Sequence, residues 1–157
     1  MTQPQRTTRI IVGLDRNGSH NDLVLQAALD QARLTNAALS VVHALAPDTA
    51  IPTAPADIAA SRDRRTARQA RQQVATEDLH RHLARFTPGR DGPYVEYDVR
   101  HGDPATVLLA AAQRASLIVI GTRGTRGTNS RSPFLLGTVS QDVAVHAPCP
   151  VMLIPTT

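Results

Sequence analysis

Four consecutive apolar residues, Leu117 to Ile120, run directly into a stretch rich in glycine, threonine and arginine. Within it, Gly124-Thr125-Arg126-Gly127 is followed after nine residues by Gly137-Thr138. A buried strand, a glycine-rich loop and a helix start are how α/β proteins bind phosphate. Glycine lets the backbone approach an anion closely, and the amides at the helix start point toward it. The pattern predicts a nucleotide-binding α/β domain.

Three further apolar runs and one alternating run predict the rest of a sheet. Residues Arg9 to Asp15 and Leu39 to Leu45 are near-continuous apolar runs, which is typical of parallel strands covered on both faces. Tyr94 to Arg100 alternates between apolar and polar residues, so we expect a half-buried edge strand there. Val151 to Ile154 is predicted to be the last strand of the sheet.

Helical patterns separate these strands. Ser19 is the predicted N-cap of the first helix. A long helical segment from about Asp57 to Phe86 has an apolar stripe in its second half, whereas its first half is mostly arginine, alanine and glutamine. Asp103-Pro104 predicts an N-cap with proline in the first helical position. Thr138 and Gln141 form a capping-box pattern at the start of the last helix.

The alternation of strands and helices predicts an open, mostly parallel five-stranded sheet with helices on both faces, a Rossmann-like architecture. We expect the strand order 3-2-1-4-5. In such a sheet, a ligand binds at the carboxyl ends of strands 1 and 4, where the winding reverses. Asp15 and the glycine-rich stretch follow those two strands, which supports a binding site between them.

Composition sets the limits of the prediction. The 157 residues are expected to form a single domain (1–157) that contains a mobile loop at residues 47–60, because prolines and small residues dominate there. No stretch has transmembrane length, the first residues lack a signal-peptide pattern, and Cys149 is the single cysteine, so we expect a cytoplasmic protein. All 17 basic residues are arginine. This bias favours GC-rich coding DNA as its explanation over binding of an anionic partner.

The spacing GxxGx9G[S/T] is also the nucleotide-binding signature of the universal stress protein family. Four segments of this chain resemble that family: Ile10 to Asp15, Ser40 to Ala44, Gly102-Asp103-Pro104 with its helix, and Leu117 to the end. The closing stretch His146-Ala147-Pro148-Cys149-Pro150-Val151 is a typical family ending. The resemblance implies a fold like that of the adenine nucleotide α-hydrolases.

The resemblance also implies a set of site residues. Those expected at the adenine and ribose are Gly13, Asp15 and Ala44, with Ile120 and Val139 flanking the base and sugar. Those expected at the phosphates are Gly121, Gly124, Gly127, Gly137 and Thr138. Arg123, Arg126 and Arg131 are candidates for a phosphate clamp, because guanidinium pairs with phosphate in a bidentate geometry; solvated loop arginines are an equal alternative.

The glycine-rich loop departs from the family pattern. Gly121 and Gly124 adjoin the strand, as the first two glycines of the family do, but only Gly124 and Gly127 have the family spacing to Gly137. The tandem Gly-Thr-Arg indicates a three-residue insertion, and both registers stay open. Arg16-Asn17 also replaces the Gly-Ser that often follows the aspartate of the first strand.

These observations favour an ATP-binding regulatory or stress-response module, with Mg2+ accompanying the nucleotide and a protein partner that the sequence does not identify. The alternatives are a cyclic AMP binder of the same fold and an interaction module whose pocket the insertion has disabled. No nucleophile-and-base arrangement or carboxylate pair is recognisable, so no catalytic residue is assigned and any ATP hydrolysis is expected to be slow.

Other residue types add little chemistry. His43 is expected to be structural, Cys149 a small and partly buried residue, and the histidines do not form a metal site. The arginines of the long helix lack interleaved aromatic residues, which argues against nucleic acid as a partner. The last strand is apolar and lies at a sheet edge, where strands pair readily, and family members commonly dimerise through it. We therefore expect a homodimer through Val151 to Ile154.

Overall fold

The computed structural model describes residues 8–15, 20–45, 56–86, 91–122 and 136–156. Its centre is a five-stranded sheet in the order β3-β2-β1-β4-β5, and all four neighbouring pairs are parallel. The strands are β1 (Arg9–Gly13), β2 (Ala38–Leu45), β3 (Val95–His101), β4 (Leu117–Gly121) and β5 (Val151–Ile154). The predicted fold class and strand order are confirmed.

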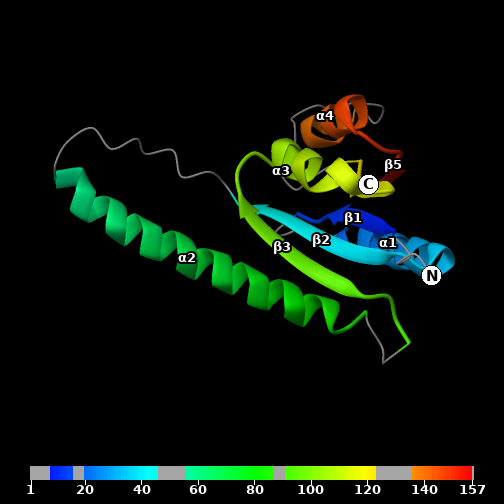
Figure 1. The fold of residues 1–157 in the computed structure, drawn as a ribbon, viewed down its shortest axis with the longest axis horizontal. Coiled ribbons are helices and arrows are strands. Elements are labelled where there is room, and N and C mark those ends of the chain that lie inside the picture. The colour runs from blue at the N-terminus through cyan, green and yellow to red at the C-terminus, as the bar shows by residue number, and fades with distance from the viewer. Residues whose placement is uncertain (1–7, 16–19, 46–55, 87–90, 123–135, 157) are drawn as a thin grey trace, which may run out of the picture.

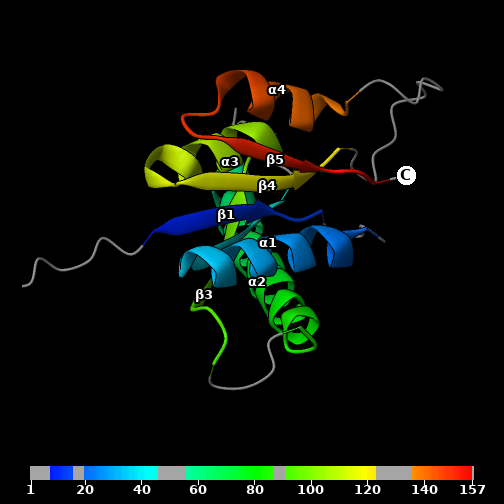
Figure 2. The ribbon, with the colours of Figure 1, turned by 90° about the vertical axis from the view of Figure 1, so that its right-hand side faces the viewer.

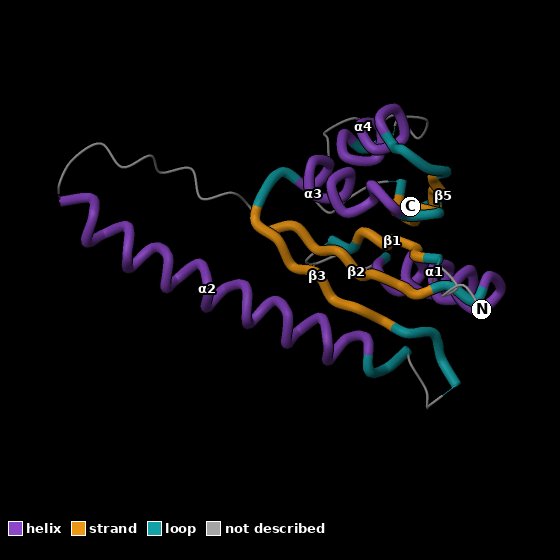
Figure 3. The backbone as a smooth tube through the Cα atoms, in the orientation of Figure 1, coloured by secondary structure: helices purple, strands orange, loops and turns teal. Residues whose placement is uncertain are grey.

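Within the described residues, two helices cover each face of the sheet (Figures 1 and 2). α1 (Asn21–Thr35) and α2 (Ala56–Leu83) lie on one face, and α3 (Pro104–Ala111) and α4 (Thr138–His146) lie on the other. A 3-10 turn, Ala112–Arg114, follows α3 directly. The chain therefore changes faces after β3, and the winding reverses between β1 and β4 (Figure 3).

The hydrophobic core has two layers because neighbouring residues of a strand point to opposite faces. Ile10 and Val12 of β1 are buried against α1, whereas Ile11 is buried in the cluster beneath α3 and α4. Both layers are needed to bury the strand fully. This is why β1, β2 and β4 read as continuous apolar runs and not as alternating ones.

Three predicted helix starts have different outcomes. The start of α3 is confirmed, because Asp103 Oδ2 accepts a hydrogen bond from the Thr106 amide at 3.0 Å and Pro104 follows the cap. For α1 the N-cap is His20, without a side-chain cap bond, and the predicted Ser19 lies outside the described residues. The capping box predicted for α4 is wrong, because Gly137 is the N-cap and Thr138 is the first helical residue.

α2 joins the molecule through its second half, as its apolar stripe predicted. Leu83 is completely buried, and Leu79 and Phe86 pack against the same core layer. The first half extends past the end of the sheet (Figure 1). Residues 47–55 of the predicted mobile loop lie outside the described part of the chain, and the remaining five, from Ala56 on, begin α2. Among the described residues, no helix is both long and apolar enough to cross a membrane.

Candidate functional site

The carboxyl ends of β1, β2 and β4 meet at one edge of the sheet, because the strands are parallel and in register. Val12 pairs with Val119 of β4, and Gly13 pairs with Val42 of β2. The next residues along these strands are the ones that the sequence analysis singled out. The structure thus brings Gly13, Asp15, Ala44, Ile120 and Gly121 to the edge where the winding reverses.

Asn21, the first residue of α1, contacts the chain just after β1. Asn21 Oδ1 accepts a hydrogen bond from the Asp15 amide at 3.1 Å, and Asn21 Nδ2 donates to the Asp15 carbonyl. Next to Asp15, Leu14 contacts a histidine: His43 is buried and its Nδ1 lies 3.0 Å from the Leu14 carbonyl oxygen. His43 is therefore a structural residue, as expected. Asn21 was not predicted from the sequence, because its contact with Asp15, six residues earlier, depends on how the start of α1 packs beside the end of β1.

Two hydrogen bonds anchor the start of α4 to the end of β4. The Gly137 amide donates to the Thr122 carbonyl at 2.8 Å, and Ser140 Oγ donates to the Gly121 carbonyl at 2.7 Å. Thr122 Oγ1 in turn accepts from the Thr156 amide at 3.1 Å, which secures the segment after β5. The sequence analysis did not identify Ser140, Thr122 or Thr156, since their partners are brought close only by the fold.

The first turn of α4 has the properties of an anion site. Its N-cap, Gly137 (φ −61°, ψ 156°), has no side chain that could accept from the amides of the turn. Such amides lack intrahelical partners, and the helix dipole places partial positive charge beside them. The amide of Gly137 itself is occupied by Thr122, so the donors available to a ligand belong to Thr138, Val139 and Ser140.

Gly13 has a packing role in addition to its place at the site. A Cβ atom there would lie 2.9 Å from Leu108 Cδ2 and 3.0 Å from Ile120 Cγ2, both of which belong to the core layer beneath α3. At Gly121 a Cβ would lie 3.0 Å from Thr156 Cγ2. Close packing alone therefore accounts for glycine at the end of β1, whatever it contacts in a complex.

Five predicted site residues lie outside the described part of the chain: Gly124, Gly127, Arg123, Arg126 and Arg131. The choice between the two glycine registers, and the arginine clamp, stay predictions. Thr138 and Val139 are described and stand in the first turn of α4, and their predicted contacts with phosphate and with the base and sugar stay predictions.

Two other features are separate from this edge. Burial raises the pKa of the Cys149 thiol, which lowers the fraction of reactive thiolate and fits the expected passive role. A hollow of about 540 Å³ lies at the opposite edge of the sheet, where Thr8, Asn36 and Tyr94 are among its lining residues. It is remote from the strand ends that carry the predicted site.

A doubly wound parallel sheet with an open helix start at its switch point defines a class of α/β proteins that bind ligands at the strand ends. The model of the universal stress protein family matches residues 6–155. The chain belongs to the universal stress protein family.

Known relatives agree with this assignment. A universal stress protein of Mycobacterium tuberculosis is 28% identical over 166 residues, which cover 99% of this chain and 50% of that protein. The chain therefore spans about half the length of this relative.

Solved structures share the fold. The universal stress protein UspA from Lactobacillus plantarum has a TM-score of 0.60 and 25% identity over 95% of this chain and 98% of that one. A universal stress protein in complex with cAMP has a TM-score of 0.63 and 20% identity over 96% and 98% of the two chains. The dAMP complex from Archaeoglobus fulgidus has a TM-score of 0.55 and 23% identity over 94% and 97%.

Proposed function

We propose that this chain is a regulatory module that binds ATP, with Mg2+, between the carboxyl ends of β1 and β4. The observation that carries the proposal is the start of α4, whose first-turn amides lack a side-chain cap and are held at the end of β4 by the Gly137 and Ser140 hydrogen bonds. An uncapped helix start fixed at the switch point of a parallel sheet favours a phosphate.

Each predicted site residue within the described part of the chain would have a role in the ATP complex. Gly13, Asp15 and Ala44 would bind adenine and ribose, and Ile120 and Val139 would flank them. The amides of Thr138 and Val139 would donate to the phosphates, together with the glycine-rich loop. The Asp15 carboxylate stands at the same edge, and Mg2+ prefers oxygen ligands such as carboxylate and phosphate, so this side chain fits the ion that accompanies ATP.

Cyclic AMP is the alternative ligand. Proteins of the same fold have been solved with cAMP and with dAMP, which supports an adenine nucleotide at this edge but does not select the triphosphate. The choice depends on the glycine-rich loop, because its glycines are the residues proposed to hold the phosphates. A third candidate, an interaction module without nucleotide, follows from the same inserted residues.

The wider setting is proposed on the same basis. We expect a single cytoplasmic domain that forms a homodimer through β5 and passes its nucleotide state to a protein partner. No catalytic residue is assigned, and any hydrolysis of ATP is expected to be slow.

Isothermal titration with ATP and Mg2+, with cAMP and AMP in parallel, tests the proposal. Saturable binding of ATP, in preference to AMP, is the expected result. Preference for cAMP would replace ATP by the alternative ligand. An absence of heat for all three, together with an unchanged melting temperature, would contradict nucleotide binding and favour the interaction module.

A further inference from the structure

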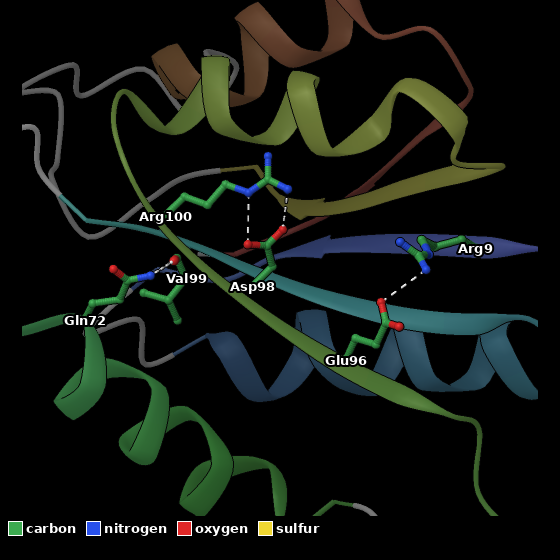
Figure 4. A network of polar contacts seen from close by, with 6 residues as sticks. All are labelled: Arg9, Gln72, Glu96, Asp98, Val99 and Arg100. Atoms are coloured by element: carbon green, nitrogen blue, oxygen red, sulfur yellow. Dashed lines mark hydrogen bonds and ion pairs between the residues drawn. The ribbon is translucent and has the colours of Figure 1, made fainter. Parts of the chain in front are cut away.

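One hydrogen bond shows which side of α2 faces the sheet before its apolar segment begins. Gln72 Nε2 donates to the Val99 carbonyl of β3 at 2.7 Å, and Figure 4 shows this contact on the opposite side of β3 from the Asp98 and Arg100 side chains. Helical residues four, seven and eight positions apart share a face. Arg68, Arg65 and Arg64 stand four, seven and eight residues before Gln72, so they continue the sheet-facing side of α2 beyond its apolar part.

In the described part of the chain, these three arginines have no acidic partner. Within the described residues, no ion pair or side-chain hydrogen bond involves Arg64, Arg65 or Arg68. Arg64 is half-buried, and its Nη2 atom is fully buried without a hydrogen-bond partner in that part of the chain. A buried guanidinium nitrogen that has lost water and gained no acceptor is costly, so it is a place where an anion would be favoured.

His101, the last residue of β3, also has buried nitrogen atoms for which the described residues supply no hydrogen-bond partner. Both of its ring nitrogens are buried and without a partner among the described residues. Since strand residues alternate, His101 points to the same face as Val99 and Tyr97, which is the face that α2 covers.

The order of contacts along the two elements brings His101 toward the arginines. The His80 ring stacks on Tyr97 at 3.6 Å, and Gln72 contacts Val99 two residues further along β3. α2 and β3 are therefore antiparallel. His101 lies two residues beyond Val99 on β3, so the same order of contacts places it near the turns of α2 that precede Gln72. Arg68 and Arg64 belong to these turns.

We propose that Arg64, Arg68 and His101 form an anion-binding site for a phosphate group of a small ligand. Guanidinium groups bind phosphate through paired N–H donors, and an imidazole N–H supplies a further one. His101 pairs in register with Leu45 of β2, so the site lies at the same edge of the sheet as the β1–β4 crevice, two strands away. A second phosphorylated ligand, or the phosphate tail of a nucleotide bound in the crevice, would satisfy the same donors.

The probe is inorganic tripolyphosphate, titrated calorimetrically at low ionic strength into the full chain. Arg64→Ala is expected to weaken its binding about tenfold or more, which is the loss of one or two charge-assisted hydrogen bonds. The matched control is Arg62→Ala, which removes the same charge from a position 200° around the helix. This control is expected to change the affinity less than about twofold, as a solvated surface charge would.

A second readout does not depend on substitution. The ring resonances of His101 are expected to shift as tripolyphosphate is added, while those of His43, bonded to the Leu14 carbonyl, stay in place. No binding of tripolyphosphate to the parent chain would overturn the proposal. Equal losses in Arg62→Ala and Arg64→Ala would also overturn it, since the attraction would then be non-specific.

Gly137→Asp separates this site from the proposed nucleotide site. Tripolyphosphate binding that survives Gly137→Asp and is lost in Arg64→Ala supports a separate phosphate ligand. ATP binding that weakens in both variants supports a site for the tail of the crevice nucleotide. If ATP fails to bind but tripolyphosphate binds and requires Arg64, the proposed function fails while this site stands.

Discussion

Gly137 is the residue at which the nucleotide proposal is most directly testable. Its φ of −61° suits any L-residue, so the substitution Gly137→Asp is expected to fold. An aspartate N-cap would even stabilise α4, because its carboxylate accepts from the first-turn amides. Those amides would then be occupied and the site negatively charged. We predict that ATP affinity measured by titration falls about tenfold or more.

The uncharged variant Gly137→Asn is the control, because asparagine caps a helix about as well as aspartate does. It is expected to retain more ATP affinity than Gly137→Asp, with an equal or higher melting temperature in both variants. Normal ATP binding by a folded Gly137→Asp protein would rule out α4 as the phosphate-binding element.

Gly13 is a second residue with a defined steric requirement. In Gly13→Ala the new methyl group would meet Leu108 Cδ2 at 2.9 Å, and Leu108 is buried. We predict that the free energy of unfolding falls by about 1–3 kcal/mol, as in other overpacked cores. In a Leu108→Val background the added cost of Gly13→Ala should shrink. Denaturant titrations of the four proteins measure this coupling, and a cost unchanged by Leu108→Val would show that Leu108 is not the obstacle.

At the scale of elements, α2 depends on a short apolar segment for its attachment. Leu83 is fully buried against the layer that contains Leu25 and Leu29. Leu83→Ala should lower the free energy of unfolding by about 2–5 kcal/mol, whereas Val74→Ala, at a position 53% exposed, should change it by less than about 0.5 kcal/mol. Similar values for the two variants in urea unfolding would contradict this attachment.

The elements were predictable because burial leaves a local record in the sequence. Strands covered on both faces are continuous apolar runs in the sequence. The start of α3 is also recognisable, because the cap is formed by the Asp103 side chain itself and Pro104 follows it. No such record exists for the hydrogen bonds between Asn21 and Asp15, for the Ser140 bond to Gly121, or for the ring nitrogens of His101, which have no partner among the described residues. Each depends on where a second element packs. The cap of α4 was misplaced by one residue because Thr138 is a good cap by type, while the Thr122 carbonyl fixes Gly137 in that position.

At the scale of the whole molecule, the two outer strands of the sheet, β3 and β5, differ in how readily they could pair with a second copy of the chain. β3 exposes a charged surface at one edge: Arg100 Nη2 lies 2.6 Å from Asp98 Oδ2, and Arg9 Nη2 lies 3.2 Å from Glu96 Oε2 across the sheet (Figure 4). Pairing there would strip water from these ion pairs. β5, at the other edge, has four apolar residues, Val151 to Ile154, all partly exposed. Edge strands bearing charges resist association, and apolar ones invite it.

The last prediction follows from this difference. The protein should sediment as a dimer in analytical ultracentrifugation, and Met152→Glu, which places a charge within β5, should shift it to monomer at the same concentration. Val145→Glu adds the same charge on α4, where Val145 is 71% exposed, and should leave the dimer intact. Circular dichroism verifies that both variants are folded. A monomeric parent protein, or a dimer that persists in folded Met152→Glu, would exclude pairing through β5. The parent dimer should also survive the removal of the β3 ion pair in Arg100→Ala, since that edge takes no part in the contact.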